Sequence, residues 1–553
     1  MTALLGAMSV NAQNKAALYD STQVEQLQEV VVKGVRAQKN APYAVTNMKK
    51  QQLDAFSKTG RELPLLFSQT PGILAWSDNG LGTGTTAMRI RGAGGSRINV
   101  TLDGVPLNSP EDQCVFWANM NSYGSLLGSV QIQRGVGTST NGDGAFGGTV
   151  ALASASPLQT PSLEVSASYG SYNTFNVGGK FSSGLLWNHL IIDGAYHETH
   201  TDGFVHGTSG RSGSYYGGLT WLTDHFRLSY KNIGNFERTG QAWNGVTAGN
   251  DDYSLMDGSY DDGSWSYNAK TGIRTYQDMW NAGLGKFNSL YERLATGSDG
   301  LFVKDANGNY QTERYRMADG TIWDKTTDNF WQNHNILSAA WTINDHWSTT
   351  ASLHYTYGHG YYEEFRYNNK LVKYGIKAAD ADGTNIKRSD FVRKKGLTQH
   401  TYGLVWSANY KDDLWDVIGG LSVQNFDGNH FGFLTYASNE VVRQQFLGGG
   451  AYRYYDSDAH KFDGNAYLKA ARHLGEQWDV FADVQYRYVG YKTDGYNDKY
   501  KTDKATGEIL THYLDINEKY HFFNPKAGFS WHTGGHRVYG SVALRSLDRK
   551  SVV

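Results

Sequence analysis

Two short segments and one single residue have side chains or backbone that could bind a metal ion or a phosphate. They are His197-Glu198-Thr199-His200, the glycine-rich stretch Arg91–Gly95, and the lone Cys114. The first lacks the HExxH spacing of a helical zinc site, and in a strand its two histidines would face opposite sides. No GK[ST] and no long helix pattern follow Arg91–Gly95, so a phosphate cradle is disfavoured. No nucleophile, base and orienting group occur together elsewhere. We therefore expect no enzyme, no cofactor and no metal centre.

The composition excludes some classes of protein and leaves two open. A chain of 553 residues predicts at least two domains. The net charge of −2 argues against a nucleic-acid partner, and a single cysteine excludes an internal disulfide framework. The 65 glycines and 37 tyrosines favour many strands joined by turns. A mean hydropathy of −0.53 fits a soluble β-rich enzyme, and it equally fits a membrane barrel whose strands face lipid with every second side chain.

After Pro157, long alternating segments are joined in turn by short turns and long polar loops. The six short turns share small or polar residues, followed in five of them by an aromatic residue and in the sixth by histidine: Gly184–Trp187, Thr223–Phe226, Asn344–Trp347, Asp412–Trp415, Gly475–Trp478 and Thr533–His536. The long loops are His206–Ser212, Asn244–Asp328, Tyr367–Arg393, Ser438–Ala451 and Thr493–Lys519. This segregation of connection lengths is typical of a transmembrane barrel. Amphipathic rings beside the turns suit the membrane interface.

Strand Trp478–Tyr491 shows the alternation most clearly. One face of this strand carries polar residues, among them Asp479, Asp483, Gln485 and Arg487. The alternating residues on the other face are mainly apolar or aromatic. A buried soluble strand would leave those charges unpaired. The same pattern along the chain predicts about 13 strands.

The segment before Pro157 is compact and mixed. Leu53–Gln69 can hold a helix that Pro71-Gly72 stops. Short strands are expected at Met88–Ile90 and Ile98–Leu102, and Asp103-Gly104 is a strong turn signal. A small α+β domain is therefore predicted here.

Three ordered segments of this domain resemble the plug of TonB-dependent outer-membrane receptors, in a Bacteroidetes-like form: Leu66–Ile73, Met88–Asn108 and Val130–Leu152. Gln133 stands where that family commonly has glutamate. The resemblance implies a mainly β chain, with the plug followed by a transmembrane antiparallel β-barrel of about 22 strands. With about 13 strands present, we expect a C-terminally truncated, monomeric barrel with an open sheet edge.

The domain boundaries follow from these patterns. Residues 1–12 read as a signal-peptide remnant ending in Val10-Asn11-Ala12, because small side chains precede Gln13. Residues 13–40 form a leader, 41–156 the plug and 157–547 the partial barrel. Residues 548–553 abandon the alternation and read as a non-native tail.

The resemblance implies TonB-dependent active import across the Gram-negative outer membrane. The expected ligand is an iron–siderophore or a similar metal chelate, with cobalamin, haem or an oligosaccharide as alternatives within the family. A passive porin or adhesin and an exported β-rich enzyme are alternatives from other classes. The expected partners are the periplasmic domain of TonB, outer-membrane lipids and the extracellular ligand.

Two sets of residues are expected to couple the plug to its surroundings. Glu29, Val30, Val31, Val32 and Lys33 resemble a TonB box, because an extended β-branched run can add as an edge strand to a partner; the alternative is the first strand of the plug. The resemblance implies that Arg89, Arg91 and Arg134 lock the plug to acids of the barrel wall, for which Glu363, Glu364 and Glu440 are candidates. The alternative is solvated surface charge.

The apical plug loops Ala75–Thr86 and Ser109–Ala118 are the expected floor of the ligand site. Aromatic faces there and in the external loops can stack on catecholate, porphyrin, corrin or sugar rings, although ordinary loop packing explains any one of them. The candidate ligand-binding residues are Trp76, Asp78, Asn79, Asp112, Gln113, Phe116, Trp117, Trp243, Tyr260, Trp265, Tyr361 and Tyr362.

Overall fold

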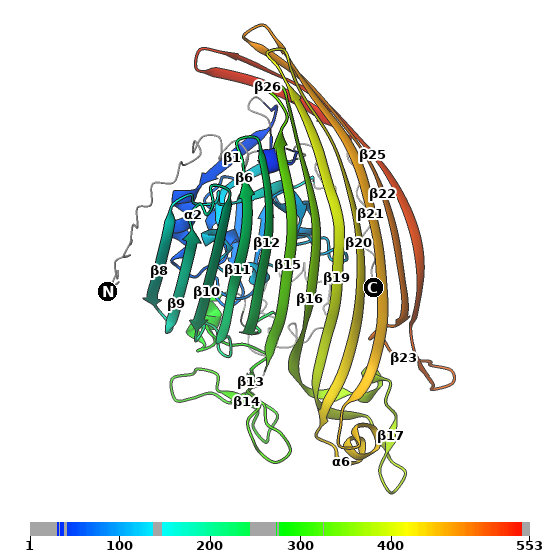
Figure 1. Cartoon of the computed structure of the whole chain (residues 1–553). Coiled ribbons are helices and arrows are strands. Elements are labelled where there is room, and N and C mark those ends of the chain that lie inside the picture. Colours follow the sequence, from blue (N-terminus) through cyan, green and yellow to red (C-terminus); the bar gives the residue numbers. More distant parts are fainter. Residues whose placement is uncertain are drawn as a thin grey trace.

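The computed structural model describes residues 30–32, 34–37, 41–135, 146–243, 273, 276–324 and 326–544. A small N-terminal domain lies against one face of a large curved antiparallel sheet (Figure 1). The prediction of a mainly β chain, with a small α+β domain before a large antiparallel sheet, is confirmed. No helix in the described ranges is long and apolar enough to cross a membrane.

The N-terminal domain, called the plug below, is built on a five-stranded sheet in the order β1-β6-β7-β4-β5. The strands are β1 (Ala44–Lys49), β4 (Ile98–Leu102), β5 (Val105–Pro106), β6 (Leu127–Arg134) and β7 (Gly148–Ser154). A separate hairpin comprises β2 (Ile73–Ser77) and β3 (Thr86–Ile90). The central strands β4 and β7 pair in parallel, and all of their residues are buried, as near-continuous apolar runs require.

The predicted helix over Leu53–Gln69 is two helices, α2 (Lys50–Ser57) and α3 (Leu63–Phe67). Gly60 between them has φ +68°, a conformation that ends helices and suits glycine. Pro64 stands in the first turn of α3, where its missing N–H costs nothing. The prediction of one continuous helix over Leu53–Gln69 is therefore wrong, because the chain breaks at Gly60.

The predicted turn at Asp103-Gly104 is confirmed. It joins β4 to β5, with φ of +51° at Asp103 and +83° at Gly104. Positive φ at both central residues is the signature of a tight turn that favours Asp-Gly. The turn fixes the Asp103 side chain at the end of the central strand.

The large sheet, called the wall below, has 13 strands, as the alternation predicts. Its edges are β8 and β26, and it is not closed. The strands in order are β8 (Pro161–Gly170), β9 (Thr174–Ser183), β10 (Leu190–Thr201), β11 (Gly210–Leu222), β12 (Phe226–Gly240), β15 (Thr327–Thr342), β16 (Trp347–Lys370), β19 (Arg388–Lys411), β20 (Trp415–Ala437), β21 (Tyr452–Leu474), β22 (Trp478–Tyr496), β25 (Tyr513–Thr533) and β26 (His536–Ala543).

All six predicted short turns join neighbouring strands of the wall. At the opposite end, Figure 1 shows the long connections with their small elements. These elements are α5 (Tyr276–Asn281), β13 (Glu292–Leu294), β14 (Thr312–Arg314), β17 (Ala378–Ala379), β18 (Asn385–Ile386), α6 (Glu440–Val442), β23 (Lys501–Thr502) and β24 (Ile509–Leu510). The loop expected at Thr493–Lys519 is shorter, because β22 and β25 continue their pairing to Tyr496 and Tyr513.

The two faces of β22 differ as predicted. Trp478, Val480 and Tyr486 are exposed on the outer face, whereas Asp483 and Arg487 are fully buried on the inner face. Arg487 donates to Asp463 of β21, which compensates its burial. At this position the inner face of the wall is polar and its charges are paired, and the plug lies against the same face.

Candidate functional site

A buried ion pair joins the plug to the wall. Lys231 of β12 bonds through Nζ to the carboxylate of Asp103, and the two side chains are 3% and 0% exposed. Ser154 donates to the same carboxylate from its backbone nitrogen at 2.9 Å and from its hydroxyl at 2.8 Å. Burial by itself would raise the pKa of Asp103, but the Lys231 ammonium and the Ser154 hydrogen bonds outweigh it and hold that pKa below its usual value.

Neutral hydrogen bonds extend this interface along β11 and β12. Asn121 of the plug donates to Ser212 Oγ at 2.6 Å, and the Tyr123 hydroxyl lies 3.3 Å from Asn235 Oδ1. Burial raises the pKa of Tyr123, so this hydroxyl stays neutral and can donate. The interface thus holds the plug without placing a net charge in it.

An apical plug loop also reaches the opposite side of the wall. Glu111 lies 2.6 Å from His430 Nε2 of β20 and accepts a hydrogen bond of 3.0 Å from the Tyr491 hydroxyl of β22. Nearby, Lys461 Nζ donates to the Pro110 carbonyl at 2.7 Å. The plug is therefore anchored at both β12 and β20–β22.

The lock predicted for the three plug arginines stays a prediction. Within the described ranges, none of Arg89, Arg91 and Arg134 forms an ion pair with a wall acid. Arg134 donates to the Pro71 carbonyl of the plug itself at 2.7 Å, and the Arg89 guanidinium lies 6.0 Å from the Trp76 ring centroid. Asp103 does form an ion pair with the wall, because the turn carries its carboxylate into the buried interface.

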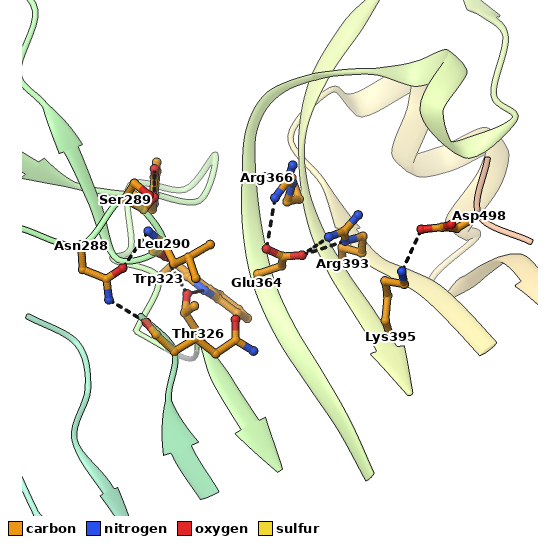
Figure 2. A network of polar contacts seen from close by, with 12 residues as sticks. Asn288, Ser289, Leu290, Trp323, Thr326, Glu364, Arg366, Arg393, Lys395 and Asp498 are labelled. Carbon is orange, nitrogen blue, oxygen red and sulfur yellow. Dashed lines mark hydrogen bonds and ion pairs between the residues drawn. The ribbon is translucent and has the colours of Figure 1, made fainter. Parts of the chain in front are cut away.

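The wall acids proposed as partners have other contacts. Glu364 bonds to Arg366 at 3.1 Å and to Arg393, as Figure 2 shows, and Glu440 of α6 pairs with Arg443, the residue that follows this helix. Glu363 follows Tyr362 on β16 and faces the other side of the wall by alternation.

Val30, Val31 and Val32 form a helical turn rather than the extended run that was predicted. Their side chains are 8%, 5% and 1% exposed. Val30 and Val31 pack on Ala340 of β15, whereas Val32 packs on the plug. Fully burying one such side chain stabilises by about 1.5–3 kcal/mol, which here outweighs the β preference of valine.

The carbonyl of Gly34, two residues after Val32, fixes this turn to the wall. Gly34 accepts a hydrogen bond from Lys469 Nζ of β21. Glu29 and Lys33 lie outside the described residues. The three valines are thus held between the plug and the wall.

A cavity of about 590 Å³ lies between the apical face of the plug and the inner face of the wall. Half of the twelve predicted ligand-binding residues line it: Trp76, Asp112, Phe116, Trp117, Trp243 and Tyr362. The wall supplies Glu237, Asp328 and Phe330, which were not predicted. Volumes of about 300–1,000 Å³ are typical of small-molecule sites.

The strand register explains how the wall residues meet. Asp328 of β15 pairs directly with Tyr362 of β16 and with Thr239 of β12. Glu237, two residues before Thr239, is therefore a diagonal neighbour of Asp328 on the same face. The Trp243 ring packs edge-on against Tyr362 with centroids 5.1 Å apart, and its Nε1 donates to Thr85 of the plug at 3.1 Å.

Other predicted ligand residues have structural positions instead. Asn79 is buried and organises its own loop, accepting from the Leu81 nitrogen at 2.9 Å. Gln113 is buried with φ +57°. Asp78 does not line the cavity, and Tyr361 lies beneath Lys394 Nζ, 3.5 Å from its ring centroid. Tyr260 and Trp265 lie outside the described residues.

Glu62 accepts hydrogen bonds from the apical segment that joins β2 to β3 and from the first residue of β3. Its Oε1 accepts a hydrogen bond of 2.6 Å from the Gly84 nitrogen, and Thr86 donates to Oε2. Burial raises the pKa of Glu62 to about 8, so it is mainly protonated at neutral pH. Burial also raises the pKa of Asp78 to about 6.

A polar network fixes the outer end of the wall above the cavity (Figure 2). Lys395 pairs with Asp498 at 2.8 Å, beside the Glu364 cluster. In the long connection between β12 and β15, Thr326 accepts from Trp323 Nε1 and donates to the Leu290 carbonyl, both at 3.0 Å. Asn288 Nδ2 donates to the Gln241 carbonyl at 2.6 Å, so the connection is held to the residue that follows β12.

Among the described residues, no group of three or more His, Cys, Asp or Glu side chains is arranged to hold a metal ion. His197 is buried in β10, whereas His200 is exposed, as expected for opposite faces of a strand. The cavity lining described above includes aromatic rings and carboxyl groups together with plug backbone.

The geometry defines the class of protein: a plug held inside a wall of antiparallel strands, with a cavity above it. Residues 37–149 match the family model described as TonB-dependent Receptor Plug Domain. The N-terminal domain is therefore a TonB-dependent receptor plug domain. Comparison with curated proteins gives no match.

The fold is similar to solved structures of this class. The ferric-catecholate import receptor Fiu from E. coli K12 has a TM-score of 0.60 at 12% identity, over 92% of this chain and 70% of that one. The ferric citrate transporter FecA has a TM-score of 0.57 at 12% identity, over 91% and 62%. The ferric yersiniabactin uptake receptor FyuA from Yersinia pestis has a TM-score of 0.55 at 12% identity, over 90% and 64%.

This chain therefore has the fold of TonB-dependent outer-membrane receptors. It spans between 62% and 70% of the length of these three structures. The predicted boundaries of leader, plug and barrel stay predictions, as does the predicted truncation.

Proposed function

We propose that this protein is an outer-membrane receptor that imports a scarce, large ligand by TonB-dependent transport. The ligand class proposed is an iron–siderophore complex or a similar metal chelate. The observation that carries the proposal is the cavity of about 590 Å³ lined by apical plug residues and the inner wall. The solved structures of this fold include receptors named for ferric catecholate, ferric citrate and ferric yersiniabactin.

Energised transport is favoured over passive diffusion by the way the plug is held. Any path past the plug has to disturb its contacts with the wall, including the Asp103–Lys231 ion pair. Removing one partner of a buried pair costs about 3–5 kcal/mol. A passive porin has no need of such a plug, whereas a receptor pulled from the periplasmic side does.

Within this proposal, Glu29–Lys33 is the docking strand for the periplasmic domain of TonB. Backbone pairing along an extended segment gives affinity without a preformed pocket. Because Val30–Val32 are packed against Ala340 and the plug, they must leave that position before they can pair. Pulling on the segment would then act directly on the plug beside it.

A proline substitution tests this docking role. Val31→Pro removes one ladder donor, and we expect loss of binding to the isolated TonB periplasmic domain and loss of uptake. Val31→Ala is the matched control, because it keeps the donor while shortening the same side chain. Unchanged uptake by Val31→Pro contradicts the assignment of the docking strand.

The import function is tested by accumulation of radioactive iron chelates in cells with and without the gene. We expect gene-dependent uptake that stops when the proton gradient is collapsed. Uptake that survives the collapse indicates a porin. Growth restored only by cobalamin, haem or an oligosaccharide keeps the importer class but replaces the ligand.

A further inference from the structure

The cavity between plug and wall is lined by more acidic than basic side chains. Glu237, Asp328 and Asp112 line it, and Arg89 is the basic side chain among its lining residues. Arg89 lies over the Trp76 ring and, within the described ranges, pairs with none of these acids. The described lining therefore holds three carboxyl groups against one guanidinium.

Glu237 is the least satisfied of these groups. It is 4% exposed, lines the cavity, and its Oε2 atom has no hydrogen-bond partner. Burying an acceptor without a partner costs about 1–3 kcal/mol, and more for a charged group. Asp328 lies diagonally across from it on β15 and adds repulsion when both are ionised. A positively charged ligand group between them would relieve both costs.

Aromatic rings surround the two acids. Tyr362 lies directly opposite Asp328 in the register, and Phe330 lies opposite Glu237. On the plug side, Trp76 and Phe116 remain 40% and 52% exposed although they face this interior cavity. Ring faces attract ammonium and guanidinium groups, by about 2 kcal/mol or more when the cation is desolvated.

We propose that the cavity binds an organic cation: the ligand presents an ammonium group to Glu237 and Asp328, and its apolar surface to the surrounding rings. This inference rests on the proposed import function and names the charge class of its ligand. A bare metal ion fits less well, because the described residues contain no group of three or more metal ligands. A chelate with only anionic groups would meet repulsion from both wall acids.

The test compares one ligand in two charge states. The probes are a ferric trihydroxamate with one free primary ammonium and the same chelate with that amine acetylated. Quenching of tryptophan fluorescence of the purified chain in detergent measures each affinity, because Trp76, Trp117 and Trp243 line the cavity. We expect the ammonium form to bind at least about tenfold more tightly.

Substitutions assign that preference to the wall acids. In Glu237→Gln combined with Asp328→Asn, we expect the preference to fall below about threefold. Glu363→Gln is the matched control, since it removes the same charge from the opposite face of β16 and should keep the preference. Heat-modifiable mobility in detergent gels verifies that each variant is folded.

Equal affinities for the two chelates overturn the inference, and so does tighter binding of the acetylated form or no binding of either. A preference that survives the double substitution also overturns it. These binding results are independent of transport. A clear ammonium preference without energised uptake contradicts only the import function, whereas energised uptake without the preference contradicts only the cation site.

Discussion

The buried pair Asp103–Lys231 gives the sharpest quantitative expectation. Asp103→Asn leaves the Lys231 ammonium buried without its counter-charge, and a single deletion of this kind costs about 3–5 kcal/mol. Lys231→Met leaves the carboxylate with its two bonds from Ser154, so we expect a cost near the lower end, about 3 kcal/mol. The double variant should cost less than the two single costs together, because no unpaired charge remains.

Hydrogen exchange of the amides in β4 and β7 measures this cost, since these strands form the buried centre of the plug. A loss of about 3 kcal/mol accelerates exchange through opening of the plug by about a hundredfold. Lys50→Met is the control, because its pair with Asp54 is 47% and 33% exposed and contributes at most about 1 kcal/mol. Single variants that change the exchange less than the control does would refute the role of the pair.

Two further predictions concern the plug. The folded pKa of Glu62, about 8, lies above its ordinary value of 4.5, so the folded plug keeps a proton that the unfolded chain releases between these values. The free energy of unfolding of the plug should therefore fall by roughly 5 kcal/mol as the pH rises from 4.5 to 8. Urea unfolding at several pH values measures this dependence, and Glu62→Gln should flatten it. A pH dependence that is unchanged in the variant contradicts the prediction. Arg134→Ala should cost only about 1 kcal/mol, the value of its bond to Pro71, and a larger loss in hydrogen exchange would mean that a wall partner exists.

Local patterns were readable from the sequence because they depend on neighbours in the chain. The alternation of β22 and the Asp103-Gly104 turn both appear as expected. Each follows from period-two strand geometry or from local turn chemistry. The same is true of the aromatic residues beside the short turns.

Features that depend on register could not be read in this way. Glu237 and Asp328 become neighbours only because β12 and β15 pair across a long connection. The inward alternation of β12, with Arg227, Lys231 and Glu237 on one face, was a signal that could have suggested wall residues facing the plug.

Residues at the plug–wall interface show the same limit. Val30–Val32 read as a strand because valine is β-branched, yet Ala340, distant in sequence, decides their conformation through burial. Arginines beside glycines suggest ion pairs with the wall, whereas the buried ion pair that the structure shows is made by an aspartate fixed by its turn. In both cases long-range packing overrides the local preference.

The lengths of the strands locate the cavity relative to a bilayer. A tilted barrel strand crosses the hydrocarbon in about 9–11 residues. Counted from Phe226 beside its short turn, β12 reaches Glu237 after that length, and β16 continues past Tyr362 to Lys370. In an outer membrane, the acidic cavity would thus lie level with the outer headgroups, where water still screens charge. A ligand bound there has not yet crossed the level of the hydrocarbon core. It passes that level only when the plug moves.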